Sequence, residues 1–163
     1  MTDYRVGYGE DIHRLVNGRK LVLLGTTIPF DLGLLGHSDA DVGFHAVGDA
    51  LLGSLGLGDI GKYFPSDDPS LTGMDSLLIV KKCLSLVRAK GYQLSNCDVS
   101  LVAEEPRLAG WIAEMKKNLA LALEIPEDRV SVKAMTNEGL DAVGRVEAIK
   151  AVAVLLVKKE ISE

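Results

Sequence analysis

Residues 36–46 read Gly-His-Ser-Asp-Ala-Asp-Val-Gly-Phe-His-Ala, and this stretch predicts the start of a helix. From Val42 to Leu55, apolar residues and His45 recur at three- and four-residue spacing, which is the period of an amphipathic helix. Ser38 and Asp41 precede that pattern and suit a variant of the capping box. We therefore expect a helix that begins near residue 38 and carries His45.

The chain on either side of this helix alternates between strand and helix patterns. Strands are expected at 4–13, 21–24, 98–103, 130–134 and 148–157, with a turn or short strand at 26–29. Further helices are expected at 75–90, closed by Gly91, and from Pro106 to residue 123, with a long surface loop at 57–72. The run 148–157 is almost continuously apolar, which is typical of a strand buried on both faces.

This alternation predicts an α/β fold, more closely an α+β sandwich, in a single domain over residues 1–163. We expect a mixed sheet of about four or five strands with helices covering one side. Such a sheet in a domain of this size leaves apolar surface to cover, and self-association is one way to cover it.

Composition narrows the functional classes. The net charge of −5 argues against nucleic acid as the main partner, because phosphate backbones select basic surfaces. The two cysteines, Cys83 and Cys97, form neither a metal-type pair nor a disulfide framework. The first residues lack the features of a signal peptide, and no apolar run is long enough to cross a bilayer. We therefore expect a cytoplasmic protein without a membrane partner.

The three histidines point to a metal site. His13, His37 and His45 all lie in the first third of the chain, among several aspartates. On a strand, the spacing of Asp11 and His13 turns both side chains to one face. With His45 they form a set of nitrogen and oxygen ligands that fits a catalytic zinc with an open fourth position, whereas magnesium prefers oxygen ligands. Asp49, one turn after His45, would hold the second ring nitrogen of that histidine.

Each of these features also has a simpler explanation. An Asp-x-His pair occurs often by chance, and His45 alone fits a partly buried helix residue. Asp41 suits a helix cap better than a metal ligand. The clustering of every histidine in the chain is what favours a metal site over these explanations.

A second polar group lies near the other end of the chain. Thr136 and Asn137 follow an expected strand, where hydroxyl, amide and backbone N–H groups meet phosphate oxygens. Glu138 suits a hard cation that bridges phosphates, although the same segment also fits a polar turn with a solvated glutamate. Residues 104–108 resemble a helix start, whose free N–H groups donate hydrogen bonds to an anion, and such starts are also common without a ligand.

The motifs together resemble one enzyme family. Residues 9–13 and 36–46 look like the two signatures of the 2-C-methyl-D-erythritol 2,4-cyclodiphosphate synthase family, and 34–35, 49–53, 57–62, 64–69 and 136–145 continue the match. The resemblance implies a metal-dependent phosphorus–oxygen lyase of the non-mevalonate isoprenoid pathway. Such an enzyme cyclises 4-diphosphocytidyl-2-C-methyl-D-erythritol 2-phosphate and releases CMP.

The resemblance also implies a role for individual residues. Asp11, His13 and His45 would bind one zinc ion per subunit, and Glu138 would hold Mg²⁺ or Mn²⁺ on the diphosphate. His37 and Thr136 would stabilise the transition state. The substrate would further contact Ser38, Asp59, Ile60, Gly61, Phe64, Pro65, Ser66, Asp67, Asp68, Ala103, Glu104, Glu105, Pro106, Arg107, Leu108, Ala109, Met135, Asn137, Ala142 and Arg145.

The resemblance also implies a homotrimer with active sites between its subunits. Glu10 and the stretch Asp141-Ala142-Val143 depart from relatives whose central cavity takes an isoprenoid diphosphate, so we do not expect that ligand here.

Two other functions use the same residues. One is a zinc-dependent nucleotide or sugar phosphohydrolase, which would release inorganic phosphate. The other is a non-catalytic trimer that binds CDP and zinc.

Overall fold

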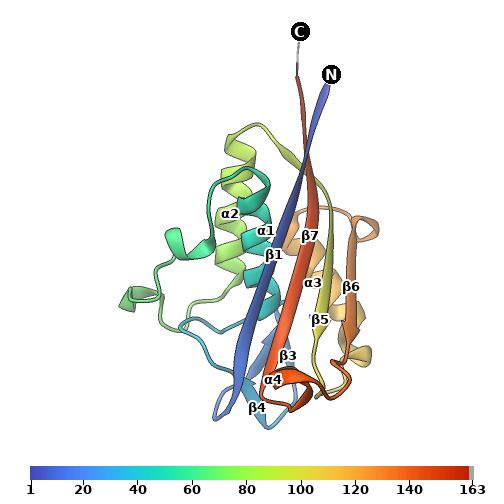
Figure 1. The fold of residues 1–163 in the computed structure, drawn as a ribbon. Coiled ribbons are helices and arrows are strands. Elements are labelled where there is room, and N and C mark those ends of the chain that lie inside the picture. Colours follow the sequence, from blue (N-terminus) through green and yellow to red (C-terminus); the bar gives the residue numbers. More distant parts are fainter. Residues whose placement is uncertain (162–163) are drawn as a thin grey trace.

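The computed structural model describes residues 1–161 and contains a mixed sheet in the order β4-β1-β7-β5-β6 (Figure 1). Its strands are β1 (Thr2–Asn17), β4 (Leu32–Leu34), β5 (Gln93–Val102), β6 (Val130–Met135) and β7 (Ala148–Glu160). β5 and β6 run parallel, and the other neighbours run antiparallel. A separate two-stranded sheet consists of β2 (Leu21–Leu23) and β3 (Thr26–Ile28). This mixed α/β architecture confirms the expected fold class.

Three long helices cover one face of the sheet (Figure 1). They are α1 (Val42–Ser54), α2 (Leu77–Ala89) and α3 (Ile112–Leu123), and a short turn of helix, α4 (Asp141–Gly144), precedes β7. Gly91 follows α2 with a φ of 81°, so it ends that helix in the left-handed conformation that was expected. The chain between α1 and α2 is the predicted long loop, interrupted by 3-10 turns at Ile60–Lys62 and Pro69–Leu71.

Helix α1 packs unusually close to β1 because two glycines of the strand face it. A Cβ atom on Gly7 would lie 1.9 Å from the carbonyl oxygen of Ala50, and one on Gly9 would lie 2.1 Å from that of Ala46. Both distances are far below van der Waals contact, so any side chain would force the helix away. The glycines therefore set the distance between the strand that carries Asp11 and the helix that carries His45.

The opposite face of the sheet is apolar and exposed in the single chain. Val6, Tyr8 and Ile12 of β1 are 66%, 56% and 53% exposed, and Val154 of β7 is 43% exposed. The prediction that β7 is buried on both faces is therefore wrong for one chain: its residues alternate between buried and partly exposed. The reason is that the long helices cover only the inner face.

Two predicted helix starts are also wrong. The first helix begins at Val42, and its N-cap is Asp41, whose carboxylate accepts the N–H of Phe44 at 3.1 Å. The third begins at Ile112 rather than Pro106. Glu104 instead accepts N–H groups of Asn137 and Gly139 across the chain, which holds this segment against the loop after β6.

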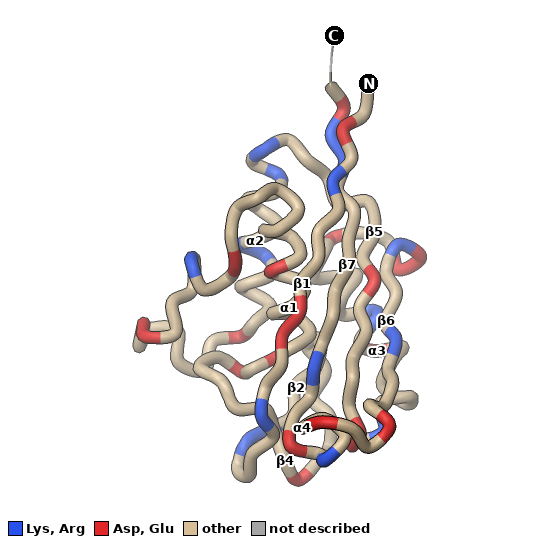
Figure 2. Tube along the Cα trace, in the orientation of Figure 1, with Lys and Arg blue, Asp and Glu red and all other residues tan. Residues whose placement is uncertain are grey.

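Charged residues of both signs are spread over the molecule (Figure 2). Within residues 1–161, no helix combines the length and the apolar character that crossing a membrane requires.

Gly9→Ala should destabilise the fold, because the new methyl group would overlap backbone atoms of α1, which move only if the whole helix shifts. We expect the free energy of unfolding to fall by about 1–3 kcal/mol or more, as measured by chemical denaturation. Gly53→Ala, on the same helix, is the matched control. Its Cβ would lie 3.5 Å from the carbonyl of Tyr8, and alanine favours a helix by up to about 1 kcal/mol. Equal losses in both variants would contradict the role of the close packing.

Candidate active site

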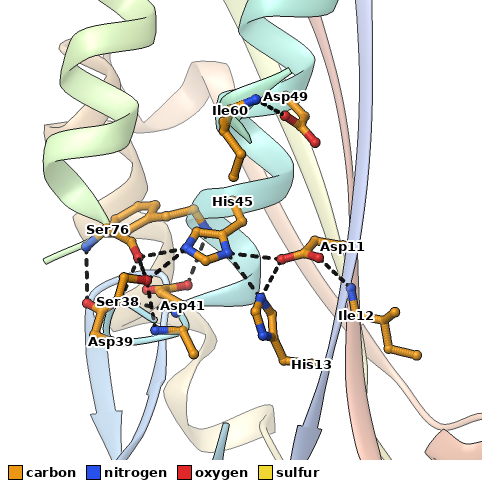
Figure 3. A network of polar contacts seen from close by, with 12 residues as sticks. Asp11, Ile12, His13, Ser38, Asp39, Asp41, His45, Asp49, Ile60 and Ser76 are labelled. Atoms are coloured by element: carbon orange, nitrogen blue, oxygen red, sulfur yellow. Dashed lines mark hydrogen bonds and ion pairs between the residues drawn. The ribbon is translucent and has the colours of Figure 1, made fainter. Parts of the chain in front are cut away.

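Two elements bring three metal-ligand side chains together. Asp11 and His13 point from β1 toward α1, and His45 points back from that helix (Figure 3). Asp11 Oδ2 lies 2.7 Å from His13 Nε2 and 3.0 Å from His45 Nδ1. The two ring nitrogens are 3.1 Å apart. The predicted cluster is therefore present in the fold.

The other side of each imidazole ring is occupied by a protein group. His13 Nδ1–H donates to the carbonyl oxygen of Leu35 at 2.6 Å, so Nε2 of a neutral ring carries a lone pair toward Asp11. His45 Nε2 faces the hydroxyl groups of Ser38 and Ser76 at 3.1 and 3.0 Å. Both rings thus direct their remaining nitrogen at the carboxylate.

Charge and burial shift the acid–base properties of the cluster. Burial raises the pKa of Asp11, but hydrogen bonds and charge from His13 and His45 outweigh it and hold that pKa well below its usual range. Burial lowers the pKa of His13, yet the contact with Asp11 outweighs it and the net pKa is raised. Each group favours its charged form through the other.

The three ligand atoms fit a divalent metal. One nitrogen from each histidine and one oxygen of Asp11 lie within 4.8 Å of one another. Two lone pairs and a carboxylate that converge in this way repel one another unless a cation lies among them. A set of two imidazoles and one carboxylate is a common donor set for a metal with an open position.

The cluster lies in a cleft of about 750 Å³. Loop residues predicted to contact substrate line this cleft, namely Asp59, Ile60, Gly61, Phe64, Pro65, Ser66 and Asp67. Leu71, Met74 and Ile79 line it too and were missed, because apolar residues in a loop or a helix give no signal of a site. Within the described chain, the lining includes four aspartates but no lysine or arginine. A phosphorylated ligand would therefore need cations from elsewhere.

His37 and Ser38 also line the cleft. His37 Nε2–H donates to the carbonyl oxygen of Asp68 at 2.8 Å, and the His37 carbonyl accepts the N–H of Gly73 at 2.8 Å. These bonds tie His37 to the long loop at both its ring and its backbone. Asp68 is thus near the cleft through its backbone, although it is not among the lining residues.

Asp49 lines the cleft but does not contact the second nitrogen of His45. Its carboxylate accepts the N–H of Ile60 at 2.8 Å (Figure 3). The expectation of an Asp49–His45 hydrogen bond is wrong, because Ser38 and Ser76 already occupy that nitrogen. Burial and the negative charges of Asp59 and Asp11 raise the pKa of Asp49, although the Ile60 N–H opposes the shift.

The second polar group lies elsewhere in the chain. Thr136 Oγ1 donates to Glu138 at 3.2 Å, and the Ala103 N–H donates to the Met135 carbonyl at 3.0 Å. Segments 103–109 and 135–139 thus lie together, as their joint assignment to one ligand requires. Neither segment lines the cleft, and Ala142 and Arg145, in and just after α4, do not line it either.

The strand pairing measures how far apart the two groups lie. Directly paired residues form one row across the sheet, from Ile12 of β1 through Lys150 of β7 and Val102 of β5 to Met135 of β6. Two strands therefore lie between β1 and β6, which places the two ends of the row about 14 Å apart. Within one chain, the metal cluster and the Thr136–Glu138 group are therefore two separate groups of polar residues.

Comparison with known proteins agrees with this geometry. Residues 4–158 match the YgbB family. The chain is 53% identical over 152 residues to the 2-C-methyl-D-erythritol 2,4-cyclodiphosphate synthase of Moorella thermoacetica, with 93% of each chain covered. It is 51% identical over 160 residues to that of Nostoc punctiforme, covering 98% of this chain and 100% of the relative. This chain belongs to the 2-C-methyl-D-erythritol 2,4-cyclodiphosphate synthase family.

Solved structures support the same membership. A CDP-bound 2C-methyl-D-erythritol-2,4-cyclodiphosphate synthase has a TM-score of 0.87 and 40% identity, covering 94% of this chain and 99% of that one. The bifunctional IspDF of Campylobacter jejuni has a TM-score of 0.94 and 35% identity. There the match covers 98% of this chain and 43% of the longer protein. The resemblance found in the sequence is confirmed.

His45→Ala should abolish metal binding, because it removes one of the three converging ligand atoms. We expect elemental analysis of the purified protein to show less than a tenth of the wild-type metal content. His37→Ala is the control, since His37 lines the same cleft without joining the cluster, and it should keep its metal. Loss of metal from both variants, or from neither, would contradict the assignment.

Proposed function

We propose that this protein converts 4-diphosphocytidyl-2-C-methyl-D-erythritol 2-phosphate into 2-C-methyl-D-erythritol 2,4-cyclodiphosphate and CMP, as a phosphorus–oxygen lyase of the non-mevalonate isoprenoid pathway. An oxygen of the substrate's 2-phosphate forms a bond to its β-phosphorus. The bond from that phosphorus to the bridging oxygen breaks, and CMP leaves with that oxygen. The observation that carries the proposal is the Asp11, His13 and His45 cluster in the cleft of a chain from this family.

Zinc is the metal we propose for the cluster, held by Asp11, His13 and His45. When bound there, it would polarise a phosphoryl oxygen and balance charge in the transition state. The nitrogen-rich donor set favours zinc over magnesium. Among residues 1–161, the cleft lining has four aspartates and no lysine or arginine, which agrees with a site that relies on bound cations.

The chain's own residues orient the substrate. His37 and Ser38 present a ring and a hydroxyl group to the cleft, and we assign them to the phosphates. The loop from Asp59 to Asp68 would enclose the methylerythritol part. Because His37 is hydrogen-bonded to the Asp68 carbonyl and to Gly73 N–H, a shift of this loop moves His37 as well.

The metal cluster and the Thr136–Glu138 group would be two half-sites of one active site, and the second would bind the cytidine diphosphate. We assign Thr136 to the transition state and Glu138 to a Mg²⁺ or Mn²⁺ ion on the diphosphate, since a carboxylate suits a hard cation. Segment 103–109, with Met135 and Asn137, would hold the nucleoside. The printed description of a solved relative as a CDP-bound form supports a cytidine nucleotide as ligand.

A homotrimer with sites between subunits would unite the two half-sites. Two facts support it. Two strands lie between the half-sites in one chain, and the uncovered sheet face is apolar, with Val6, Tyr8 and Val154 exposed. Burying such a face against a second copy is a favourable process, and rotation by closed symmetry gives each cleft a neighbouring half-site.

We also propose the cytoplasm as the compartment of this enzyme. Cys83 and Cys97 are free and buried, and burial raises the pKa of both thiols to about 12. Such thiols are chemically inert and suit a reducing environment.

Turnover is the direct test of the reaction. The purified protein with the diphosphocytidyl substrate and magnesium should release one CMP per cyclic diphosphate, followed by phosphorus NMR. A zinc chelator should stop the reaction, and added zinc should restore it. Release of inorganic phosphate without a cyclic product would indicate a phosphohydrolase instead. Bound CDP and zinc without turnover would indicate a non-catalytic binding protein.

The shared site can be tested by mixing two defective variants. His45→Ala disables the metal half-site, and Glu138→Ala disables the nucleotide half-site. Trimers that carry both chains, isolated through two different tags, should recover about a third of wild-type activity, because one of three sites then combines two intact halves. Each variant alone is the control. Mixed trimers no more active than the separate variants would place the whole site within one chain.

A further inference from the structure

Ser76 is a completely buried residue at the N-cap of α2, but its hydroxyl group does not cap that helix. A serine at this position usually accepts an N–H from the first turn. Here the N–H groups of Leu78 and Ile79, which such a serine would accept, go instead to the carbonyl oxygens of Asp75 and Ser76 at 3.0 and 3.1 Å. The Ser76 hydroxyl turns instead to Asp39 and to His45 (Figure 3). Ser76 therefore makes hydrogen bonds to the candidate metal site in place of the usual capping bond to its own helix.

The direction of these hydrogen bonds follows from what each group is able to donate. Ser76 Oγ lies 2.5 Å from Asp39 Oδ1, and an ionised carboxylate only accepts, so the serine proton points to Asp39. Toward His45 Nε2, at 3.0 Å, the same oxygen is then an acceptor. The ring must therefore carry its proton on Nε2. A neutral His45 then has its lone pair on Nδ1, the atom that faces Asp11 and His13.

Asp39 is itself held firmly in the orientation that this chain of bonds needs. Its Oδ1 also accepts the N–H of Asp41 at 3.1 Å, and its Oδ2 accepts the N–H of Ser76 at 3.2 Å. With the Ser76 hydroxyl, three donors thus hold the two oxygens of this carboxylate in place. The Ser76 hydroxyl proton therefore has a fixed acceptor in Asp39, and turning it toward His45 would break that hydrogen bond.

Ser38 cannot perform this task alone. Its hydroxyl oxygen is 3.1 Å from His45 Nε2 and accepts the N–H of Ala40 at 3.1 Å. The Ser38 hydroxyl faces another neutral hydroxyl group, Ser76 Oγ at 3.2 Å. Its proton is therefore held less firmly than the Ser76 proton, which points to a carboxylate. Ser38 also lines the cleft, whereas Ser76 does not. A ligand in the cleft has access to Ser38, while the Ser76 bond to His45 persists behind the ring.

We propose that Ser76, oriented by Asp39, is a positioning residue that holds His45 in the Nε2–H tautomer and so prepares Nδ1 to bind the metal. The proposal rests on the metal-binding part of the proposed function. It requires nothing of the cytidine substrate. Outer partners of metal-bound histidines fix the tautomer and ring orientation, and their loss commonly weakens metal binding by about 10- to 100-fold.

Metal affinity is the first measurement. Zinc dissociation constants should be determined by competition with a chromophoric chelator for the wild type and for Ser76→Ala. The variant should bind zinc about 10- to 100-fold more weakly. Ser54→Ala is the matched control, because Ser54 is a buried serine whose hydroxyl donates to the Leu51 carbonyl, away from the cluster. It should bind zinc as the wild type does, whatever its stability.

Asp39→Asn tests the direction of the bonds and does not rely on a deleted hydroxyl group. An amide can donate to Ser76 Oγ, which frees the serine proton to turn toward His45 Nε2 and favours the opposite tautomer. This variant keeps the size of the side chain and should also weaken zinc binding. If Ser76→Ala fails to fold, Asp39→Asn carries the test. Wild-type affinity in Asp39→Asn, or in a folded Ser76→Ala, would overturn the proposal.

Nitrogen NMR of the histidine rings reads the tautomer without any metal. The chain has three histidines, so long-range proton–nitrogen spectra of ¹⁵N-histidine protein contain three ring systems, assigned with His13→Ala and His37→Ala. In metal-free wild type at alkaline pH, His45 should be protonated at Nε2, and in Asp39→Asn it should shift toward Nδ1. Protonation at Nδ1 in the wild type would overturn the proposal.

These measurements also separate this proposal from the proposed reaction. A wild type that binds zinc and shows the Nε2–H tautomer but forms no cyclic product would refute the reaction and leave the role of Ser76 intact. Normal turnover with unchanged zinc affinity in Ser76→Ala and Asp39→Asn would refute the role of Ser76 alone.

Discussion

The close approach of α1 to β1 is the constraint on which the rest of the molecule depends. Gly7 and Gly9 leave room for the helix backbone where any side chain would collide with the carbonyl oxygens of Ala50 and Ala46. This contact fixes where His45 stands relative to Asp11 and His13, whose ligand atoms must lie within a few ångströms for a metal to bridge them. Gly7 and Gly9, which lack side chains, thus allow the close packing that brings the three ligand residues together.

The site that results is rich in negative charge. Asp11, Asp49, Asp59 and Asp67 line the cleft, and burial together with neighbouring carboxylates raises the pKa of Asp49. A polyphosphate would be repelled from such a surface in water, and more strongly in a partly buried cleft. A cation bound at the Asp11 cluster would offset this negative charge, because a bound metal is often the largest local charge in a site.

Much of the fold and the ligand cluster could be predicted from the sequence, for identifiable reasons. The period-two spacing of Asp11 and His13 and the helical period around His45 are local signals, and both led to the observed geometry. What failed depends on contacts between distant residues. Pro106 does not start a helix because Glu104 bonds to the loop after β6, and Ser38 does not cap α1 because Asp41 does. Ser76 gave no signal, since its partner His45 lies 31 residues earlier in the chain.

The outer face of the sheet links the fold to the proposed assembly. The apolar run of β7 led to the wrong prediction of burial on both faces, because the face with Val154 is left uncovered in one chain. The alternation of β1 carries the same information, because its inner side has Gly7 and Gly9 against α1 while its outer side has Val6 and Tyr8. A strand that is apolar on both sides, but covered by helices on only one, is what an oligomer built around the sheet requires. In the proposed trimer, the incomplete burial of the sheet and the separation of the two proposed half-sites would have one common explanation, an active site completed by a neighbouring chain.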